Sequence, residues 1–259
     1  MVRPVKIATW NVNGIRARVE AVGDWLARHR PDVLCMQETK VVDDEFPFEE
    51  LTRLGYVVKV SGQAGYNGVA IAASLPVNDV STGLFDDPVD AERRVISATV
   101  GGVRVVNVYV PNGKSVELPS FPEKLRWLER LRVTLDTRED AAKDLVLCGD
   151  FNVALEDCDV YDPVRMRGRL HFHPDEHRAL GRVLEFGLSD AYRDRHAEGG
   201  RYTWWDYRGG DFRSNRGLRI DYAFVTRSVA ARLTSAEIDV EPRRLPKSSD
   251  HTPVIVEFS

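Results

Sequence analysis

The chain has 259 residues, of which 43% are hydrophobic and 29% charged, and its formal net charge is −4. This length and composition suit one large globular domain or at most two small ones. The sequence contains no run of about 18 apolar residues, which excludes a membrane-spanning helix, and its start, MVRPVKIATW, lacks the apolar stretch of a signal peptide. The negative net charge gives no global attraction for nucleic acid, although a local basic patch can still bind phosphates.

The predicted elements alternate between short strands and amphipathic helices. The strand VKIATW is followed by a helix over residues 16–28, and then by the strand-like runs DVLCMQ, YVVKV, GVAIAA, VISATV and VRVVNVYV. A second helix is predicted over residues 123–135 and is followed by the strand LVLCGD. A third helix, over residues 174–186, begins at Pro174, a favourable first-turn residue. The strands IDYAFV and PVIVEF complete the pattern.

No linker or change of composition divides the chain, so the pattern predicts one domain over residues 1–259. We expect an α/β sandwich of four layers, in which two packed mixed sheets are flanked by helices. The segments ATWNVN and LCGDFNV each end a predicted buried strand on an Asn, and this weak internal similarity supports two sheets. Cys35 and Cys148 lie in apolar runs, and Cys158 leaves the number of cysteines odd. These features predict reduced, buried thiols and a cytoplasmic protein that does not bind membranes.

Polar residues repeatedly follow the ends of the predicted strands. A single Asn or Asp at such a place most often makes a turn or caps a helix. Six such endings together indicate one cleft, because strand ends from a layered α/β fold converge there. The endings contain Asn11 and Asn13, Glu38, Tyr109 with Asn112, Asp150 with Asn152, Asp221, and Asp250 with His251.

The residue types in these endings favour phosphate chemistry assisted by a metal ion. Oxygen atoms of Glu38, Asp250 and Asn11 suit a hard cation such as Mg²⁺ or Mn²⁺. Asp150 can orient or deprotonate a water, a role that typically contributes about 10²–10⁴-fold to a rate. No G-x-S-x-G, P-loop or dinucleotide motif occurs, so water is the simplest nucleophile. Donors to a phosphoryl oxygen are available from His251, Asn152 and Tyr109.

Two other patterns have simpler explanations. The run from His173 to His177 matches the H-x-x-E-H zinc-protease pattern, but Pro174 begins a predicted helix and leaves His173 outside it, so we expect no zinc site. Arginines are dense in two loops, where a solvated surface is the simplest interpretation. They are Arg165, Arg167 and Arg169 in one loop, and Arg213, Arg216 and Arg219 in the other.

Eight stretches together resemble the exonuclease III family of apurinic/apyrimidinic (AP) endonucleases, bacterial branch, within the endonuclease/exonuclease/phosphatase superfamily. They are TWNVNGIRAR, PDVLCMQETK, GYNGVAI, NVYVPNG, LCGDFNVA, YTWWDYR, NRGLRIDYAF and SSDHTPV, and they occur in the family's order. The resemblance implies a Mg²⁺- or Mn²⁺-dependent hydrolase of double-stranded DNA. It would use water to cut 5′ to abasic sites, and would also trim or clean blocked 3′ ends. Nothing in the sequence suggests a coiled coil or a large interface, so we expect a monomer.

The resemblance also implies a role for each site residue. The metal would bind mainly Glu38, with Asn11 and Asp250 nearby. The catalytic residues would be Asp150, Asn152, Tyr109, and His251 oriented by Asp221. The substrate-binding residues would be Asn112, Trp204, Leu218, Arg94 and Asn13. Asn13 lies where other members have Asn or Asp, and the Asn removes one possible carboxylate ligand for a second metal ion. The loop with Arg165, Arg167 and Arg169 lies where family members contact DNA.

Asp250 and His251 are adjacent, which suggests a catalytic pair. Consecutive residues in an extended segment point to opposite sides, however, so Asp250 is poorly placed to orient the imidazole. The resemblance supplies Asp221 for that role. Two alternatives stay open: a superfamily phosphodiesterase or phosphatase that acts on RNA or a phosphoinositide, and a catalytically silent nucleic-acid-binding protein. Every position where the family has a polar site residue carries one here, which disfavours a silent binding protein. The stretches YTWWDYR and NRGLRIDY favour DNA over the other substrates.

Overall fold

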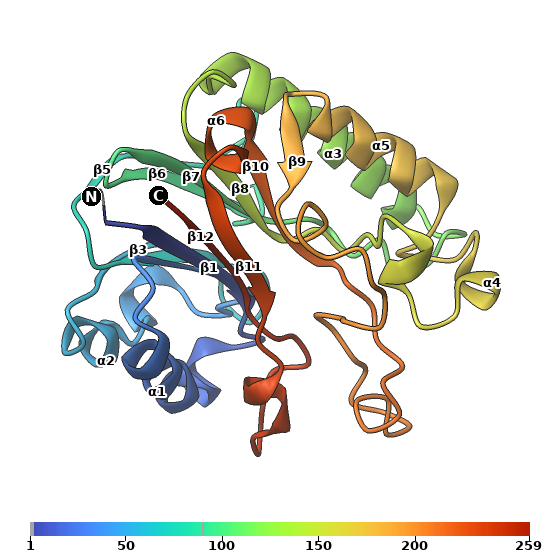
Figure 1. The fold of residues 1–259 in the computed structure, drawn as a ribbon, viewed down its shortest axis with the longest axis horizontal. Coiled ribbons are helices and arrows are strands. Elements are labelled where there is room, and N and C mark those ends of the chain that lie inside the picture. Colours follow the sequence, from blue (N-terminus) through green and yellow to red (C-terminus); the bar gives the residue numbers. More distant parts are fainter. Residues whose placement is uncertain (1–2, 90) are drawn as a thin grey trace.

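The computed structural model describes residues 3–89 and 91–259 and contains two six-stranded sheets (Figure 1). In spatial order, the first sheet contains β11 (Leu233–Ile238), β12 (Val254–Phe258), β1 (Val5–Asn11), β2 (Val33–Gln37), β4 (Val69–Ala73) and β3 (Val57–Ser61). The second contains β5 (Val77–Thr82), β6 (Val95–Val100), β7 (Val103–Tyr109), β8 (Leu145–Asp150), β10 (Asp221–Thr226) and β9 (Leu188–Asp190). Each sheet is mixed, because β1–β2 and β7–β8 are parallel pairs among antiparallel neighbours.

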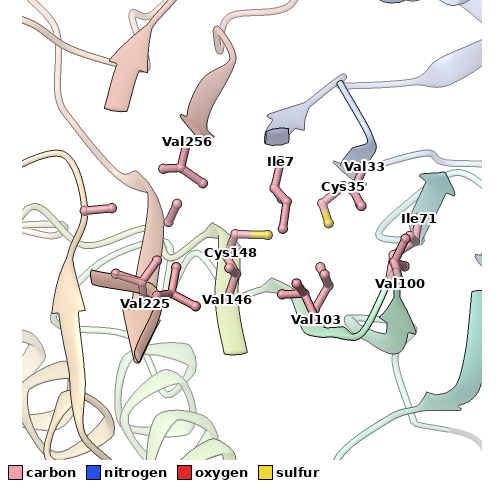
Figure 2. Close-up of a cluster of buried hydrophobic side chains, with 14 of the residues drawn as sticks. Ile7, Val33, Cys35, Ile71, Val100, Val103, Val146, Cys148, Val225 and Val256 are labelled. Atoms are coloured by element: carbon pink, nitrogen blue, oxygen red, sulfur yellow. The ribbon is translucent and has the colours of Figure 1, made fainter. Parts of the chain in front are cut away.

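The apolar side chains divide the molecule into four layers, which confirms the predicted architecture. One cluster fills the space between the sheets and includes Ile7, Cys35, Val146, Cys148 and Val256 (Figure 2). A second cluster packs α1 (Val19–His29) and α2 (Phe48–Thr52) on the outer face of the first sheet. A third packs α3 (Ser120–Arg138) and α5 (Pro174–Leu184) on the outer face of the second (Figure 1).

The helix boundaries differ from the predicted ones by a few residues. α1 begins at Val19, because Ile15–Ala17 form a separate 3-10 turn, η1. α3 is longer at both ends than residues 123–135. α5 begins at Pro174 as predicted and ends at Leu184. The remaining short helices are η2 (Asp43–Glu45), η3 (Asp157–Asp159), α4 (Pro163–Met166), α6 (Arg227–Ala230) and η4 (Glu241–Arg244).

The zinc-like pattern forms no shared ligand face. The ring of His173 caps α5 by accepting a 3.1 Å hydrogen bond from the backbone N–H of Asp175. The ring of His177 lies 2.9 Å from the carbonyl oxygen of Ala154. The predicted burial of Cys35 and Cys148 is confirmed, whereas Cys158 is partly exposed. Among the described residues, no helix is both long and apolar enough to span a membrane.

Candidate active site

Three predicted site residues lie side by side on one rung of the second sheet. β8 ends at Asp150, and the register places Tyr109 of β7 and Asp221 of β10 directly opposite it. Directly paired residues project from the same face of a sheet, so these three side chains share a face. A 2.9 Å hydrogen bond from Asn11 of β1 to Asp150 shows that this face is turned toward the first sheet.

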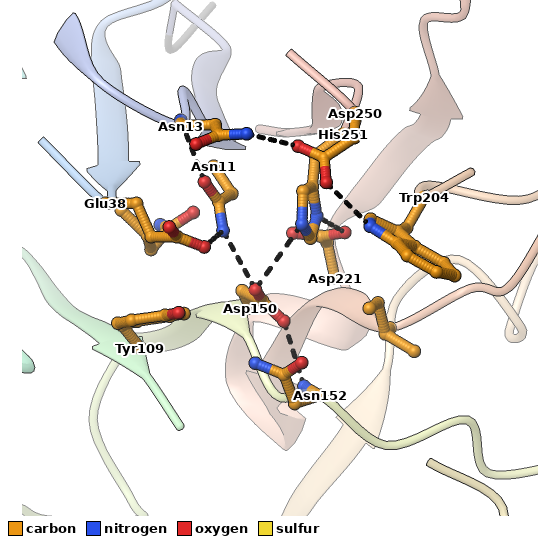
Figure 3. Close-up of polar contacts among 12 residues, drawn as sticks. Asn11, Asn13, Glu38, Tyr109, Asp150, Asn152, Trp204, Asp221, Asp250 and His251 are labelled. Atoms are coloured by element: carbon orange, nitrogen blue, oxygen red, sulfur yellow. Dashed lines mark hydrogen bonds and ion pairs between the residues drawn. The ribbon is translucent and has the colours of Figure 1, made fainter. Parts of the chain in front are cut away.

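The first sheet contributes Asn11 and Glu38 to the same place (Figure 3). The Nδ2 of Asn11 donates to Glu38 Oε1 at 2.7 Å as well as to Asp150 Oδ2. Glu38 follows β2 directly and has a φ of 51°, a left-handed conformation that is rare outside glycine and is typical of functional sites. The Oδ1 of Asn11 accepts from the backbone N–H of Asn13 at 3.0 Å. Asn11 therefore links the two carboxylates as a donor, and its oxygen faces away from them.

His251 is paired with Asp221 and not with its sequence neighbour. The Nδ1 of His251 lies 2.9 Å from Asp221 Oδ2, and its Nε2 lies 3.7 Å from Asp150 Oδ2. Burial alone would lower the pKa of His251, but the carboxylates of Asp221 and Asp150 outweigh it and raise the pKa to about 10. The imidazole is therefore a buried cation at neutral pH. Such a cation can donate a proton or a hydrogen bond toward a phosphate.

The carboxylate of Asp250 is directed to other partners. Its Oδ1 accepts from Asn13 Nδ2 at 2.8 Å, and its Oδ2 accepts from the indole N–H of Trp204 at 3.0 Å. Burial opposes ionisation, but the charge of His251 and these two hydrogen bonds lower the pKa of Asp250. Asp250 is thus an anion that fixes one edge of Trp204.

A pair of asparagines borders Asp150 on the other side. The backbone N–H of Asn152 donates to Asp150 Oδ1 at 2.9 Å, and Asn152 has a left-handed φ of 53°. Its Oδ1 accepts from the Nδ2 of Asn112 at 2.9 Å. The two amides therefore stand next to each other at the rim of the site, where both can face a phosphate.

Lys124 supports this pair and was missed by the sequence reasoning. Its side chain is 0% exposed and donates to the carbonyl oxygens of Asn152, at 2.6 Å, and Asn112, at 3.3 Å. It also forms an ion pair with the buried carboxylate of Glu176 in α5. A signal was present, because Lys124 stands three residues after Phe121 and four before Leu128, on the apolar face of the predicted helix.

Two of the predicted substrate-binding residues, Trp204 and Leu218, lie beside the asparagines. Trp204 and Leu218 pair through their backbones, and the indole packs against the apolar cluster that contains Leu218. His171, a second residue that the sequence reasoning missed, has its ring centroid 6.3 Å from that of Trp204. Its Nδ1 is 2.6 Å from the carbonyl oxygen of Asn152. Burial, with help from nearby Lys124, lowers the pKa of His171 to about 3, so the ring is neutral.

Arg94 and Tyr109 form the opposite border. The Arg94 guanidinium lies 4.7 Å from the centroid of the Tyr109 ring and donates to the Tyr109 carbonyl at 3.2 Å. Burial and the charges of Glu38 and Asp150 raise the pKa of Tyr109, so its hydroxyl stays a donor. The structure therefore brings together all the predicted site residues, and leaves three exposed arginines in and just after α4, namely Arg165, Arg167 and Arg169.

The oxygen atoms of this site fit a hard divalent cation. Among the described residues, one group offers three candidate ligand atoms within 4.8 Å of one another, and it contains Glu38, Asp150 and His251. A protonated imidazole cannot bind a metal, so the carboxylates are the ligands that fit. Burial, opposed by the charge of His251, raises the pKa of Asp150 to about 7. Lys40 lies 2.7 Å from Glu38 and lowers the pKa of that carboxylate despite its burial.

Comparisons with known proteins agree with this geometry. A model of the Endonuclease/Exonuclease/phosphatase family matches residues 8–251. Exodeoxyribonuclease III of Haemophilus influenzae is 34% identical over 98% of this chain and 100% of its own length. An AP endonuclease from Archaeoglobus fulgidus superposes with a TM-score of 0.95 at 42% identity, covering 98% of this chain and 99% of its own. The 3′-5′ exonuclease NExo from Neisseria meningitidis gives 0.94 at 43% identity, covering 98% and 100%. The chain therefore belongs to the Endonuclease/Exonuclease/phosphatase family and is an exonuclease III-like phosphodiester hydrolase.

Proposed function

We propose that this enzyme repairs DNA by cutting the phosphodiester 5′ to an abasic site and by trimming or cleaning blocked 3′ ends. The names of its relatives, exodeoxyribonuclease III and AP endonuclease, support this substrate. The observation that carries the proposal is the rung of Tyr109, Asp150 and Asp221, which faces Glu38 and Asn11 across the two sheets. That arrangement concentrates donors and carboxylates around a space suited to one phosphate.

The reaction is an in-line attack of water on the phosphorus. Asp150 accepts the proton of the water, and its pKa of about 7 matches this task at neutral pH. As the new P–O bond forms, the bond to the 3′ oxygen breaks, and that oxygen takes a proton from solvent water and becomes a 3′-hydroxyl. His251, held by Asp221, donates to a phosphoryl oxygen and offsets its growing negative charge. Further donors to the phosphate are Asn112, Asn152 and Tyr109.

The cofactor we propose is Mg²⁺, with Mn²⁺ as a substitute, held mainly by Glu38, with Asn11 and Asp250 nearby, while Asp150 acts on the water. A bound divalent cation supplies Lewis-acid stabilisation of charge on the phosphate and the leaving oxygen. The side-chain oxygens of Asn11 and Asp250 accept hydrogen bonds from the Asn13 backbone and from Trp204, respectively. To bind the cation as predicted, each oxygen would have to give up this hydrogen bond. Hard oxygen donors support Mg²⁺ in preference to softer metals.

Substrate selection belongs to the other borders of the site. Trp204 and Leu218 would line the pocket for an abasic sugar that has flipped out of the DNA helix. Arg94 and Asn13 would bind the DNA backbone next to it. We further propose that the enzyme acts as a monomer on double-stranded DNA in the cytoplasm. The unpaired thiols of the chain support a reducing compartment.

An end-labelled duplex with one abasic analogue tests the proposal. With Mg²⁺ the enzyme should cut at the analogue and shorten the 3′ end of an undamaged duplex, and EDTA should stop both reactions. An intact abasic duplex at ample enzyme concentration would refute the proposal. Turnover of a soluble phosphoinositide or of RNA in its place would assign the fold to a different substrate.

A further inference from the structure

A second cavity is lined by Trp205 and by none of the candidate active-site residues. It has a volume of about 750 Å³, and Trp205 and Phe212 form part of its wall. Four cations line it, and no Asp or Glu is among its described lining residues; we call it the arginine pocket after Arg201, Arg213, Arg243 and Arg244. In a chain whose net charge is −4, this is a local concentration of positive charge. Such a concentration favours an anionic ligand.

Internal ion pairs leave most of this charge unneutralised. In the described part of the chain, Arg201, Arg213 and Arg243 have no carboxylate partner, and Arg244 pairs with Glu241 only across exposed surface at 3.1 Å. Exposed pairs of this kind contribute little. Other arginines of the same sequence cluster are neutralised, since Arg216 pairs with Asp211 and buried Arg219 with Asp159.

Arg243 is held in place before any ligand arrives. Its guanidinium lies 5.2 Å from the ring centroid of Tyr207 and 5.0 Å from that of Phe212. It donates to Ser248 Oγ at 3.1 Å and to the Trp205 carbonyl at 3.4 Å, while its buried Nε has no partner. A fixed guanidinium loses little entropy when it binds a phosphate, and its fork matches the oxygens of that group.

The pocket wall is equally well fixed. The indole N–H of Trp205 donates to Asn215 Oδ1 at 3.2 Å, and Asn215 Nδ2 donates to the Gly200 carbonyl at 3.0 Å. Gly217 lies so close that a Cβ there would come within 2.5 Å of the indole nitrogen of Trp205. Only glycine allows this approach. The cavity is thus preformed, as is usual for binding sites.

The pocket adjoins the candidate active site through two consecutive tryptophans. The indole of Trp204 donates to the Asp250 carboxylate, whereas Trp205 bonds the Asp250 carbonyl through its backbone and sends its ring into the pocket wall. The loop of residues 206–216 (orange) and η4 (red) project from the end of the sandwich at which β1 and β8 stop (Figure 1). The two consecutive tryptophans therefore border neighbouring regions at this end of the molecule, Trp204 at the candidate site and Trp205 at the pocket.

We propose that the arginine pocket binds backbone phosphates of the DNA strand that flanks the incision position. The inference rests on the proposed function, because DNA is the phosphate source it names. A free phosphate ion offers the pocket the same chemistry, and calorimetry with inorganic phosphate separates it from DNA. Occupation of the pocket would add affinity for long substrates, while a substrate too short to reach it would gain nothing.

The test compares two double variants that change the net charge equally. Arg201→Glu with Arg213→Glu alters the pocket, and Arg28→Glu with Arg227→Glu is the control, at exposed arginines of α1 and α6 without a carboxylate partner among the described residues. Fluorescence anisotropy in EDTA measures binding to abasic duplexes of about one and about three helical turns. The same pair as Arg→Gln replaces the Glu variants if these fail to fold.

On the long duplex the pocket variant should bind about tenfold more weakly than the control, and its salt slope should fall by about 0.9 for each phosphate that the pocket no longer neutralises. On the short duplex the two should agree, and kcat at saturating long duplex should be unchanged. Equal binding of the long duplex, or an equal deficit on both duplexes, would overturn the proposal. The proposal would also be overturned if calorimetry showed that wild type binds inorganic phosphate, and if the pocket substitutions abolished that binding without weakening the binding of the DNA duplex. If wild type binds no duplex at all, the proposed function itself fails.

Discussion

Asp221 and His251 lie 30 residues apart in the sequence and are joined by a 2.9 Å hydrogen bond between Oδ2 and Nδ1. The bond fixes the ring so that its other nitrogen faces Asp150, 3.7 Å away. Asp250, although adjacent in sequence, binds Asn13 and Trp204 instead. The long-range partner therefore sets the orientation and the charge of this imidazole.

Asp221→Asn should lower kcat by about 10–100-fold, the usual cost of losing a residue that orients a site group, with a smaller effect on KM. The pKa of His251, followed by NMR, should fall in this variant because the largest attractive charge is gone. Asp250→Asn is the matched control and should leave that pKa closer to the wild-type value. A wild-type kcat in Asp221→Asn would remove Asp221 from the mechanism.

Asp150→Asn should separate chemistry from binding. Loss of the proton acceptor should slow single-turnover cutting of an abasic duplex by about 10²–10⁴-fold. Binding of the duplex in EDTA, measured by anisotropy, should persist because the donors to the phosphate stay in place. A variant that keeps most of its rate would show that another group accepts the proton.

Mg²⁺ should raise the melting temperature of the wild type through the carboxylates at the site. A ligand specific for the folded state adds about 2.7 kcal/mol of stability at 100 times its Kd. Glu38→Gln should lose most of this shift, whereas Glu49→Gln, on the exposed side of α2, should keep it. A full shift in Glu38→Gln would place the cation elsewhere.

Lys124→Met should destabilise the fold by about 3–5 kcal/mol, because it leaves the buried carboxylate of Glu176 without its cation. Urea unfolding measures the loss. Changing Lys124 and Glu176 together to Met and Gln should cost less than the sum of the single changes, since no unpaired charge remains. Additive costs would show that the pair is not coupled.

His171 should make stability depend on pH in the acid range. Its folded pKa is about 3, below the unfolded value of about 6.5, so the folded state binds fewer protons. The stabilisation is complete above pH 6.5 and is lost as the pH falls from there toward 3. His171→Gln should remove this part of the slope, which urea unfolding at a series of pH values would show. His251, whose pKa of about 10 acts in the opposite direction, is present in both proteins and cancels in the comparison. Identical slopes would mean that His171 is solvated.

The strands that the sequence analysis missed share one physical reason. β5, β9 and β11 are all edge strands. No residue of β5 is buried, and β11 buries only Ala236, so neither shows the continuous apolar run by which β2 and β8 were predicted. Edge strands form because a neighbour offers hydrogen bonds, and a sequence does not reveal that neighbour.

The site shows the same limit. Strand-end polar residues such as Asp150 were predictable from local pattern, and the resemblance supplied Asp221 as the partner of His251. The rung that aligns Tyr109 with Asp150 depends on the register between strands, which only the fold determines. The contact of Lys124 with the Asn152 carbonyl joins a helix to a loop, and the outward Oδ1 of Asn11 depends on a local turn. The place of Lys124 on an apolar helix face indicates that it is buried, but the sequence does not indicate which groups either side chain contacts.

Glu38 directly follows a strand of one sheet and Asp150 ends a strand of the other, so the apolar layer that contains Cys35 and Cys148 also sets the spacing of the catalytic groups. A misplacement of about 1 Å can cost about 10²-fold in rate. A small displacement of one sheet relative to the other would thus abolish activity while every strand and helix is still intact.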